Sequence, residues 1–124
     1  MLETYVIHFK EQGNIKFAFR RFEIDRGRII VYDSNNDPAV HQAFLSLEQV
    51  AALFPEKRDE DPVGFTVRLI NGDSFLICAD SFMIEESNLT FYRYQNYRNQ
   101  PLKNIHVALD AVAAITPQAG LERA

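Results

Sequence analysis

One six-residue segment occurs twice in this chain, and that repetition limits the folds open to it more than any other feature. Val50–Pro55 reads Val-Ala-Ala-Leu-Phe-Pro, and Val112–Pro117 reads Val-Ala-Ala-Ile-Thr-Pro. The match extends towards the N-terminus, where residues 5–32 align without a gap on residues 65–92. Repetition at a nearly fixed spacing indicates that one structural unit is used twice. We therefore predict a small β domain that is present in two tandem copies.

The predicted organisation has three parts: a first small β-barrel repeat at residues 1–55, a charged linker at residues 56–63, and a second small β-barrel repeat at residues 64–118. The linker carries a dense run of charges and is bounded by Pro55 and Pro62, as is typical of inter-domain segments. A copy of about 60 residues is marginal in size on its own. We therefore expect the two copies to pack together or to assemble further.

The second strand of each copy carries the most informative pattern. Apolar residues fall on odd positions over residues 15–19 and on even positions at residues 22 and 24, and the same slip recurs in the second copy. Neighbouring side chains of a flat strand point to opposite faces, so a slip of this kind requires a bulge or a bend. We place that bend near residues 20–21 and 80–81. A long strand bent in its middle allows a few strands to close into a small barrel.

The rest of each copy completes the strand count. Asn71-Gly72 predicts a type I′ hairpin turn after the first strand of the second copy. Variable loops at residues 33–42 and 93–104 separate the third strand from the fourth, and a one-turn helix is expected before the last strand. The predicted fold class is all-β, with two tandem five-stranded, strongly bent small barrels of the Sm-like or SH3-like type, related by internal duplication.

The repeated Val-Ala-Ala segment is apolar on both faces. A strand of this kind is typically buried on both sides, so we expect it to lie at an interface. The interface residues predicted from this segment are Val50, Leu53, Val112 and Ile115.

Several motifs of the second copy resemble those of the Sm-like family of the bacterial Hfq type. The matching residues are Leu69-Ile70-Asn71-Gly72, then Phe75, then Ser81-Phe82, then residues 107–117. The resemblance spans residues 65–117 and, more faintly, residues 5–55. It implies five-stranded, strongly bent barrels that commonly form rings. Two barrels in one chain would then build a ring from fewer chains, such as a trimer that imitates a hexamer.

The chain departs from this family at the residues that bind RNA. The family's Lys-His pair falls on Leu109-Asp110 in the second copy and on Leu47-Glu48 in the first. An acid in place of the histidine and the missing lysine remove local donors to phosphate and base. The resemblance therefore implies the fold of the family, whereas the residues of its RNA-binding pair are absent here.

Charge gives little support to a nucleic-acid-binding role. The net charge is −4, and residues 1–60 carry 8 basic and 10 acidic side chains, against 5 and 7 in residues 61–124. Neither half has the basic excess that phosphate-backbone binding usually needs. Cys78 is the single cysteine, so no intrachain disulfide forms. The sequence shows no apolar run of membrane-spanning length and no leader pattern at its start, and we expect a cytoplasmic protein.

One segment nevertheless interleaves aromatic and basic residues. Rings on which bases stack, beside cations that meet phosphates, are typical of single-stranded RNA or DNA binding. The alternative is that the first residues of the segment finish a strand and the others form a packed loop or a protein contact. The candidate nucleic-acid-binding residues are Tyr92, Arg93, Tyr94, Tyr97, Arg98 and Lys103.

A second basic group, which includes Arg20 and Arg21, lies at the predicted bend of the first copy. Acidic residues are interspersed there, which favours a solvated surface held by ion pairs. The corresponding place in the second copy is acidic, with Asp80 and Glu85-Glu86. Opposite charges at equivalent places would suit a head-to-tail association of the two copies, within or between chains. Arg20 and Arg21 are therefore further interface candidates.

No enzyme signature stands out. His8, His41 and His106 lack the spacing of metal ligands, and no catalytic triad, glycine-rich phosphate loop or paired-carboxylate pattern is found. We predict no catalytic residues, no metal and no cofactor. The expected function is a non-enzymatic interaction or assembly module that forms a homo-oligomer, of which a ring is one form, with no membrane role. The alternative is binding of single-stranded RNA or DNA through residues 91–103. An enzyme or a small-ligand barrel ranks last, since side chains fill barrels this small.

Overall fold

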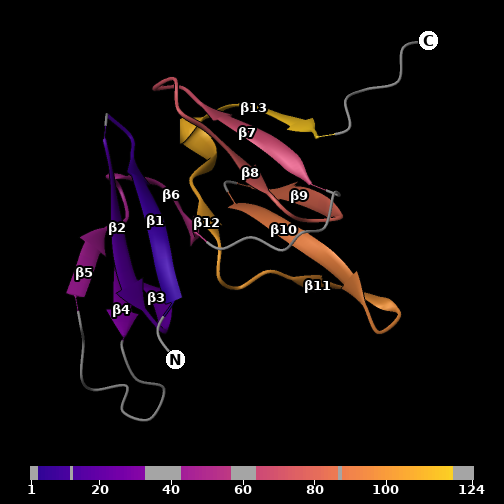
Figure 1. The fold of residues 1–124 in the computed structure, drawn as a ribbon, viewed down its shortest axis with the longest axis horizontal. Helices are drawn as coiled ribbons and strands as arrows, with labels where there is room; N and C mark the ends of the chain where they lie inside the picture. The colour runs from indigo at the N-terminus through magenta and orange to yellow at the C-terminus, as the bar shows by residue number, and fades with distance from the viewer. Residues whose placement is uncertain (1–2, 12, 33–42, 57–63, 87, 119–124) are drawn as a thin grey trace.

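The computed structural model describes residues 3–11, 13–32, 43–56, 64–86 and 88–118, which form an all-β protein (Figure 1). We call residues 3–56 the first half and residues 64–118 the second half. The strands are β1 (Glu3–Phe9), β2 (Asn14–Phe19), β3 (Arg21–Asp25), β4 (Arg28–Tyr32), β5 (Ala43–Ser46), β6 (Val50–Pro55), β7 (Phe65–Leu69), β8 (Ser74–Ile77), β9 (Ser81–Glu85), β10 (Asn88–Gln95), β11 (Arg98–Pro101), β12 (His106–Val107) and β13 (Val112–Pro117). Within these ranges no helix has the length and apolar character needed to cross a membrane.

The strands build four antiparallel sheets, with the orders β12-β6-β1-β2, β3-β4-β5, β13-β7-β8 and β11-β10-β9. The all-β prediction is confirmed. Closure into barrels is not found among the described residues, because each half divides into two separate sheets. In both halves the last strand pairs with the first, and the first pairs with the second. The predicted helical turn before the last strand is the 3-10 helix η1 (Leu109–Ala111) in the second half and a turn at residues 47–49 in the first.

The predicted bend separates the two sheets of each half. β2 ends at Phe19 and β3 begins at Arg21, while β8 ends at Ile77 and β9 begins at Ser81. These positions are the ones at which the apolar pattern changes phase. The slip therefore marks the place where the chain leaves one sheet and enters the next.

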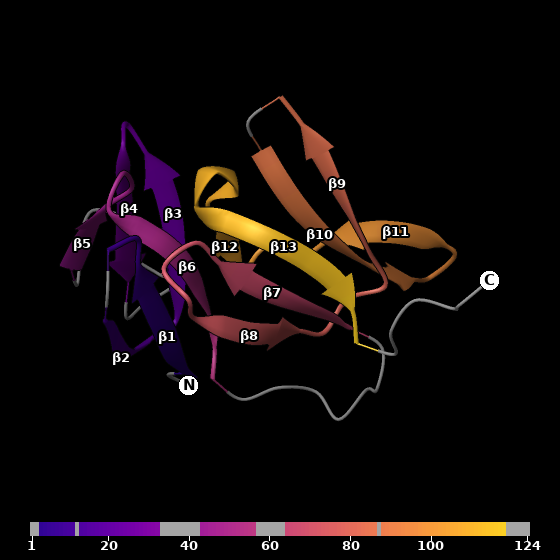
Figure 2. The same cartoon turned by 90° about the horizontal axis from the view of Figure 1, so that it is seen from above.

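Beyond the bend, only the first apolar residue of each strand reaches the interior. Phe22 and Phe82 pack against the cores, whereas Ile24 and Ile84 are 50% and 52% exposed. The hairpins of β3 and β9 therefore project past the cores that their first residues cover (Figure 2).

The predicted loop at residues 93–104 is wrong, because most of it is a hairpin. β10 continues to Gln95 and pairs with β11, with Gln95 opposite Arg98. Asn96 and Tyr97 form the turn with φ of 54° and 65°, the left-handed values of a type I′ turn. Tyrosine rarely adopts such values, so Asn96-Tyr97 does not have the Asn-Gly pattern that predicts this turn. The other predicted loop, residues 33–42, lies outside the described residues, as do His41 and residues 57–63 of the linker.

The Asn71-Gly72 turn also differs from the prediction. Gly72 has a φ of 100°, but Asn71 is not in the left-handed region, so the turn is not of type I′. The Asn71 side chain instead makes two hydrogen bonds. Its Oδ1 accepts from the Asp73 backbone N–H at 2.8 Å, and its Nδ2 donates to the Phe9 carbonyl of the first half at 2.9 Å. This turn therefore contacts the other half of the molecule.

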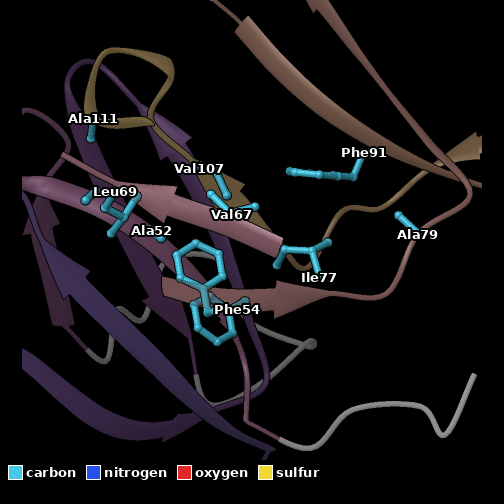
Figure 3. Packing of buried hydrophobic residues seen from close by; sticks show 11 residues of the cluster. Ala52, Phe54, Val67, Leu69, Ile77, Ala79, Phe91, Val107 and Ala111 are labelled. Carbon is cyan, nitrogen blue, oxygen red and sulfur yellow. The ribbon is translucent and has the colours of Figure 1, made fainter. Parts of the chain in front are cut away.

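Two clusters of buried apolar residues form the interior. The first cluster belongs to the first half and contains Tyr5, Ile7, Phe19, Ile29, Val31, Val50 and Leu53. The second cluster is built mainly from the second half but includes three residues of β6, namely Ala51, Ala52 and Phe54 (Figure 3). β6 therefore supplies side chains to the interior of both halves, and the two halves share an apolar interior.

Candidate functional site

The most distinctive contact in the molecule is the one between its halves, which we call the internal seam and which centres on β6 and β12. The two strands are antiparallel, with His106 opposite Leu53 and Val107 opposite Ala52. The Ala108 backbone N–H donates to the Ala51 carbonyl at 2.8 Å. β6 also pairs with β1 along its other side, so both of its edges are occupied (Figure 1).

Aromatic rings pack beside this strand pairing. The imidazole of His8 lies against the rings of Phe54 and Phe75, at centroid distances of 5.7 and 5.4 Å, and the two phenyl rings stack at 4.5 Å. His8 Nδ1 lies 3.0 Å from the Asp73 carboxylate. The ring faces give dispersion and quadrupole attraction, and the carboxylate satisfies one ring nitrogen. His8, placed in a strand by the sequence, thus serves as a structural residue of the internal seam.

A second histidine of the internal seam lacks a full set of hydrogen bonds. His106 Nε2 is buried without a partner. Burial lowers the pKa of His106, and the nearby Lys10 ammonium lowers it further. Lys10 Nζ itself pairs with the exposed Asp110 carboxylate at 2.9 Å. The internal seam therefore holds a histidine that resists protonation beside an ion pair exposed to solvent.

The counterpart of β6 in the second half is open. β13 carries the second copy of the repeated segment, and among the described strands it pairs with β7 alone. Ala113 and Ala114 are exposed, whereas their counterparts Ala51 and Ala52 are 0% exposed. The same apolar sequence is thus covered in one half and exposed to solvent in the other.

The other open strand belongs to the first half. Within the part of the chain that the structure describes, β5 pairs only with β4 and ends its sheet. Phe44, in the middle of β5, is 66% exposed. Edge strands present unpaired N–H and C=O groups to which another strand can be added. We call β5 and β13 the two outer edges; β5 lies at one end of the molecule, and β13 crosses its middle (Figure 2).

The interface residues predicted from the repeated segment occupy several environments. Val50 and Leu53 are buried in the first cluster, and Val112 and Ile115 pack against the second cluster at its margin. The side chains that cross the internal seam are the neighbours of these residues, Ala51, Ala52 and Phe54. The sequence signal for them was the apolar run on both faces, but it did not tell which residues point to which half.

The two arginines predicted for an interface lie at the bend between β2 and β3. Arg21 Nη1 pairs with Glu23 at 2.7 Å, and its guanidinium lies 4.1 Å from the centre of the Tyr32 ring. Arg20 is exposed beside it. The hydrogen bonds, ring contacts and strand pairing described above for the internal seam involve neither of them.

The structure brings part of the predicted nucleic-acid-binding set together on the β10–β11 hairpin. Tyr94 is 57% exposed and Tyr97 at the turn is 95% exposed, with Arg98 exposed next to it. Lys103 is also exposed but follows the hairpin, and Tyr92 is half-buried. Arg93 is half-buried as well, and its Nη2 donates to the Cys78 carbonyl at 3.4 Å.

A small cavity of about 150 Å³ lies between the halves. Its polar lining includes Glu3, Arg93 and Asn104, and Phe54 and Ile105 supply apolar walls. Among the described residues, no group of three or more His, Cys, Asp or Glu side chains is arranged to hold a metal ion.

Comparison of the chain with protein-family models, with curated proteins and with solved structures finds no match.

Proposed function

We propose that this protein is a non-enzymatic interaction and assembly module that binds a protein partner by strand addition to its outer edges. The observation that carries the proposal is the difference between β6 and β13. The repeated segment is covered on both sides in β6 and on one side in β13. Exposed apolar edges of this kind favour pairing with a further strand.

The proposal includes an origin by duplication from one Sm-like unit. Three observations support it: the gapless sequence match, the matching orders β6-β1-β2 and β13-β7-β8, and the bend at corresponding positions. A fourth is a pair of equivalent backbone hydrogen bonds after the first strand of each half. Phe9 N–H donates to the Gly13 carbonyl, and Leu69 N–H donates to the Asp73 carbonyl.

A pair of matched aromatic substitutions tests the proposal. Phe44→Asp places a carboxylate on the outer edge formed by β5, and Tyr97→Asp places the same group at a more exposed aromatic position away from both outer edges. Burying an unpaired carboxylate in an interface is costly. Phe44→Asp should therefore weaken association by at least about tenfold in a sedimentation dilution series, and Tyr97→Asp should leave it unchanged. Equal behaviour of both variants and the parent would count against strand addition at this outer edge.

A second candidate function is binding of single-stranded RNA or DNA by the β10–β11 hairpin. The exposure of Tyr94 and Tyr97 beside Arg98 favours it, because unhindered rings next to a cation suit stacked bases and phosphates. The acidic net charge of −4 opposes it. Anisotropy of a labelled oligonucleotide at low salt tests this function, since phosphate contacts are strongest there. Binding that Tyr97→Asp abolishes and Phe44→Asp preserves would support it, and no binding at low salt would eliminate it.

A further inference from the structure

We infer that the partner of the outer edges is a second copy of this chain, bound head to tail, with β13 of one chain adding to β5 of the next. This inference rests on the proposed function and specifies its partner. The internal seam supplies the template, because β13 is the counterpart of β6 and the segment containing β5 is the counterpart of the segment containing β12. The outer contact would then repeat between chains what β6 and β12 form within one chain.

The orientation of the side chains on β6 supports this arrangement. Val50 and Leu53 point into the first cluster, which is the interior of their own half. Ala51, Ala52 and Phe54 belong to the second cluster and so fill the interior of the neighbouring half. β6 therefore works as a shared strand with one face for each half.

β13 has the same two sets of positions, but only one set is covered. Val112 and Ile115, the counterparts of Val50 and Leu53, pack against the interior of their own half. Ala113, Ala114 and Thr116 are exposed, and they are the counterparts of the three β6 residues that cross the internal seam. The positions that β6 buries in the interior of the other half are therefore exposed to solvent on β13. This is what is expected of a shared strand whose second partner is missing.

The internal seam also defines the register. Val50 matches Val112, an offset of 62, so the pairing of His106 with Leu53 becomes Phe44 opposite Ile115 in the outer contact. The hydrogen bond from Ala108 N–H to Ala51 O becomes one from Ser46 N–H to Ala113 O. Leu47 N–H points towards its own half, where it donates to Gly27 O at 2.9 Å. Because N–H directions alternate along a strand, the Ser46 N–H points outward.

Exposed apolar side chains gather at the positions that this contact would cover. Ile15, Phe44 and Ile70 are 45%, 66% and 69% exposed. Their counterparts are Phe75, His106 and Lys10, all of which lie at the internal seam. Ile70 replaces Lys10 and Glu48 replaces Asp110, so the exposed ion pair of the internal seam is not repeated and this corner of the outer contact is more apolar.

The outer surfaces also carry one exposed charge of each sign near this contact. Arg68 is the counterpart of His8, and residues 10–13 are the counterpart of the turn that contains Asp73. Arg68 and Glu11 are both exposed, one on each of the surfaces that would meet. Arg68 on the β7 side would therefore lie near the Glu11 carboxylate, in the region where His8 lies 3.0 Å from Asp73 in the internal seam.

The two surfaces of this contact differ, so it is heterologous. A heterologous contact leaves one free surface of each kind in any open assembly, and it ends only when a ring closes. The expected species is thus a closed oligomer with a defined number of chains, or an open filament if the rotation between chains does not close.

Engineered cysteines test both the partner and the register. Phe44→Cys and Ile115→Cys are made singly in a Cys78→Ala background. Alanine is chosen because the counterpart of Cys78 in the first copy is Ala18. Directly opposed residues in paired strands lie within disulfide distance. On mild oxidation, a mixture of the two single variants should give dimers with one chain of each kind, and neither variant alone should give dimers. Phe44→Cys mixed with Ala113→Cys is the off-register control and should react weakly.

The outcomes separate this inference from the proposed function. Disulfide dimers of Ile115→Cys alone would show that two β13 strands pair symmetrically, which overturns the head-to-tail inference and keeps strand addition. An oligomer that Phe44→Asp disrupts but that gives no mixed disulfide also overturns it. A protein that remains monomeric at all concentrations and forms no disulfides contradicts both.

As an independent check, Arg68→Glu should raise the dissociation constant roughly two- to fivefold, and Glu11→Arg in the same chain should restore it. Failure of this rescue contradicts the proposed register.

Discussion

Removal of the Phe54 ring tests whether the internal seam couples the two halves. Phe54 is 3% exposed and belongs to the second cluster, although it lies on β6 of the first half. Truncation of a buried phenylalanine to alanine typically costs about 3–5 kcal/mol. For a chain of this length 1 kcal/mol corresponds to about 4 °C in Tm, so Phe54→Ala should lower Tm by roughly 12–20 °C.

The stacking partner of Phe54 allows a more specific measurement. Phe54 and Phe75 stack at 4.5 Å across the internal seam, and such aromatic pairs contribute about 0.5–1.5 kcal/mol beyond their buried area. In a double-mutant cycle, Phe54→Ala and Phe75→Ala should therefore show a coupling of about 1 kcal/mol in urea unfolding followed by circular dichroism. Phe44→Ala, at an exposed aromatic position, is the control and should couple to neither.

Two results would refute this reasoning. A loss below about 1 kcal/mol for Phe54→Ala would mean that the ring is not buried as it is in the internal seam. Additive single effects in the cycle would mean that the two rings do not meet. Unfolding in two separate steps in the parent protein would also contradict a shared interior, because halves that share a cluster are expected to unfold together.

Three further predictions concern polar groups of the internal seam. Burial and Lys10 lower the pKa of His106. The parent protein should therefore lose stability as pH falls below about 6.5, because the unfolded chain gains a proton there that the folded chain does not. Urea titrations of His106→Phe should show a smaller loss of stability over the same pH range. Asp110→Asn breaks an exposed ion pair with Lys10 and should cost at most about 1 kcal/mol, with a difference in Tm that vanishes at high salt. Asn71→Ala removes the hydrogen bond to Phe9 O and should cost about 1–2 kcal/mol in the same titrations, whereas no loss would contradict that bond.

The sequence predicted the strand pattern where local rules decide it. The phase slip marked the bend after Phe19 because side-chain alternation is a local property of a strand. It did not predict the β10–β11 hairpin, because Tyr97 occupies a left-handed turn position that tyrosine rarely adopts. The hydrogen bond between Asn71 and Phe9 was also missed, because residues 62 positions apart along the chain meet only after the halves have packed.

At the candidate site, local sequence could not predict which copy of the repeated segment is buried. Ala51 and Ala113 stand in the same local sequence, yet Ala51 is fully buried and Ala113 is exposed. No local propensity distinguishes them, because the difference arises from β12, which covers β6. The sequence could therefore indicate that the repeated segment lies at an interface, but it could not tell which copy is covered within the chain.

The mass of the protein in solution tests the central claim most directly. The account predicts that light scattering gives a mass above 14.3 kDa at micromolar concentration, a defined multiple of it where the ring closes, and that Phe44→Asp lowers this mass. A mass of 14.3 kDa for the parent protein at every concentration would contradict the claim that β13 is a shared strand.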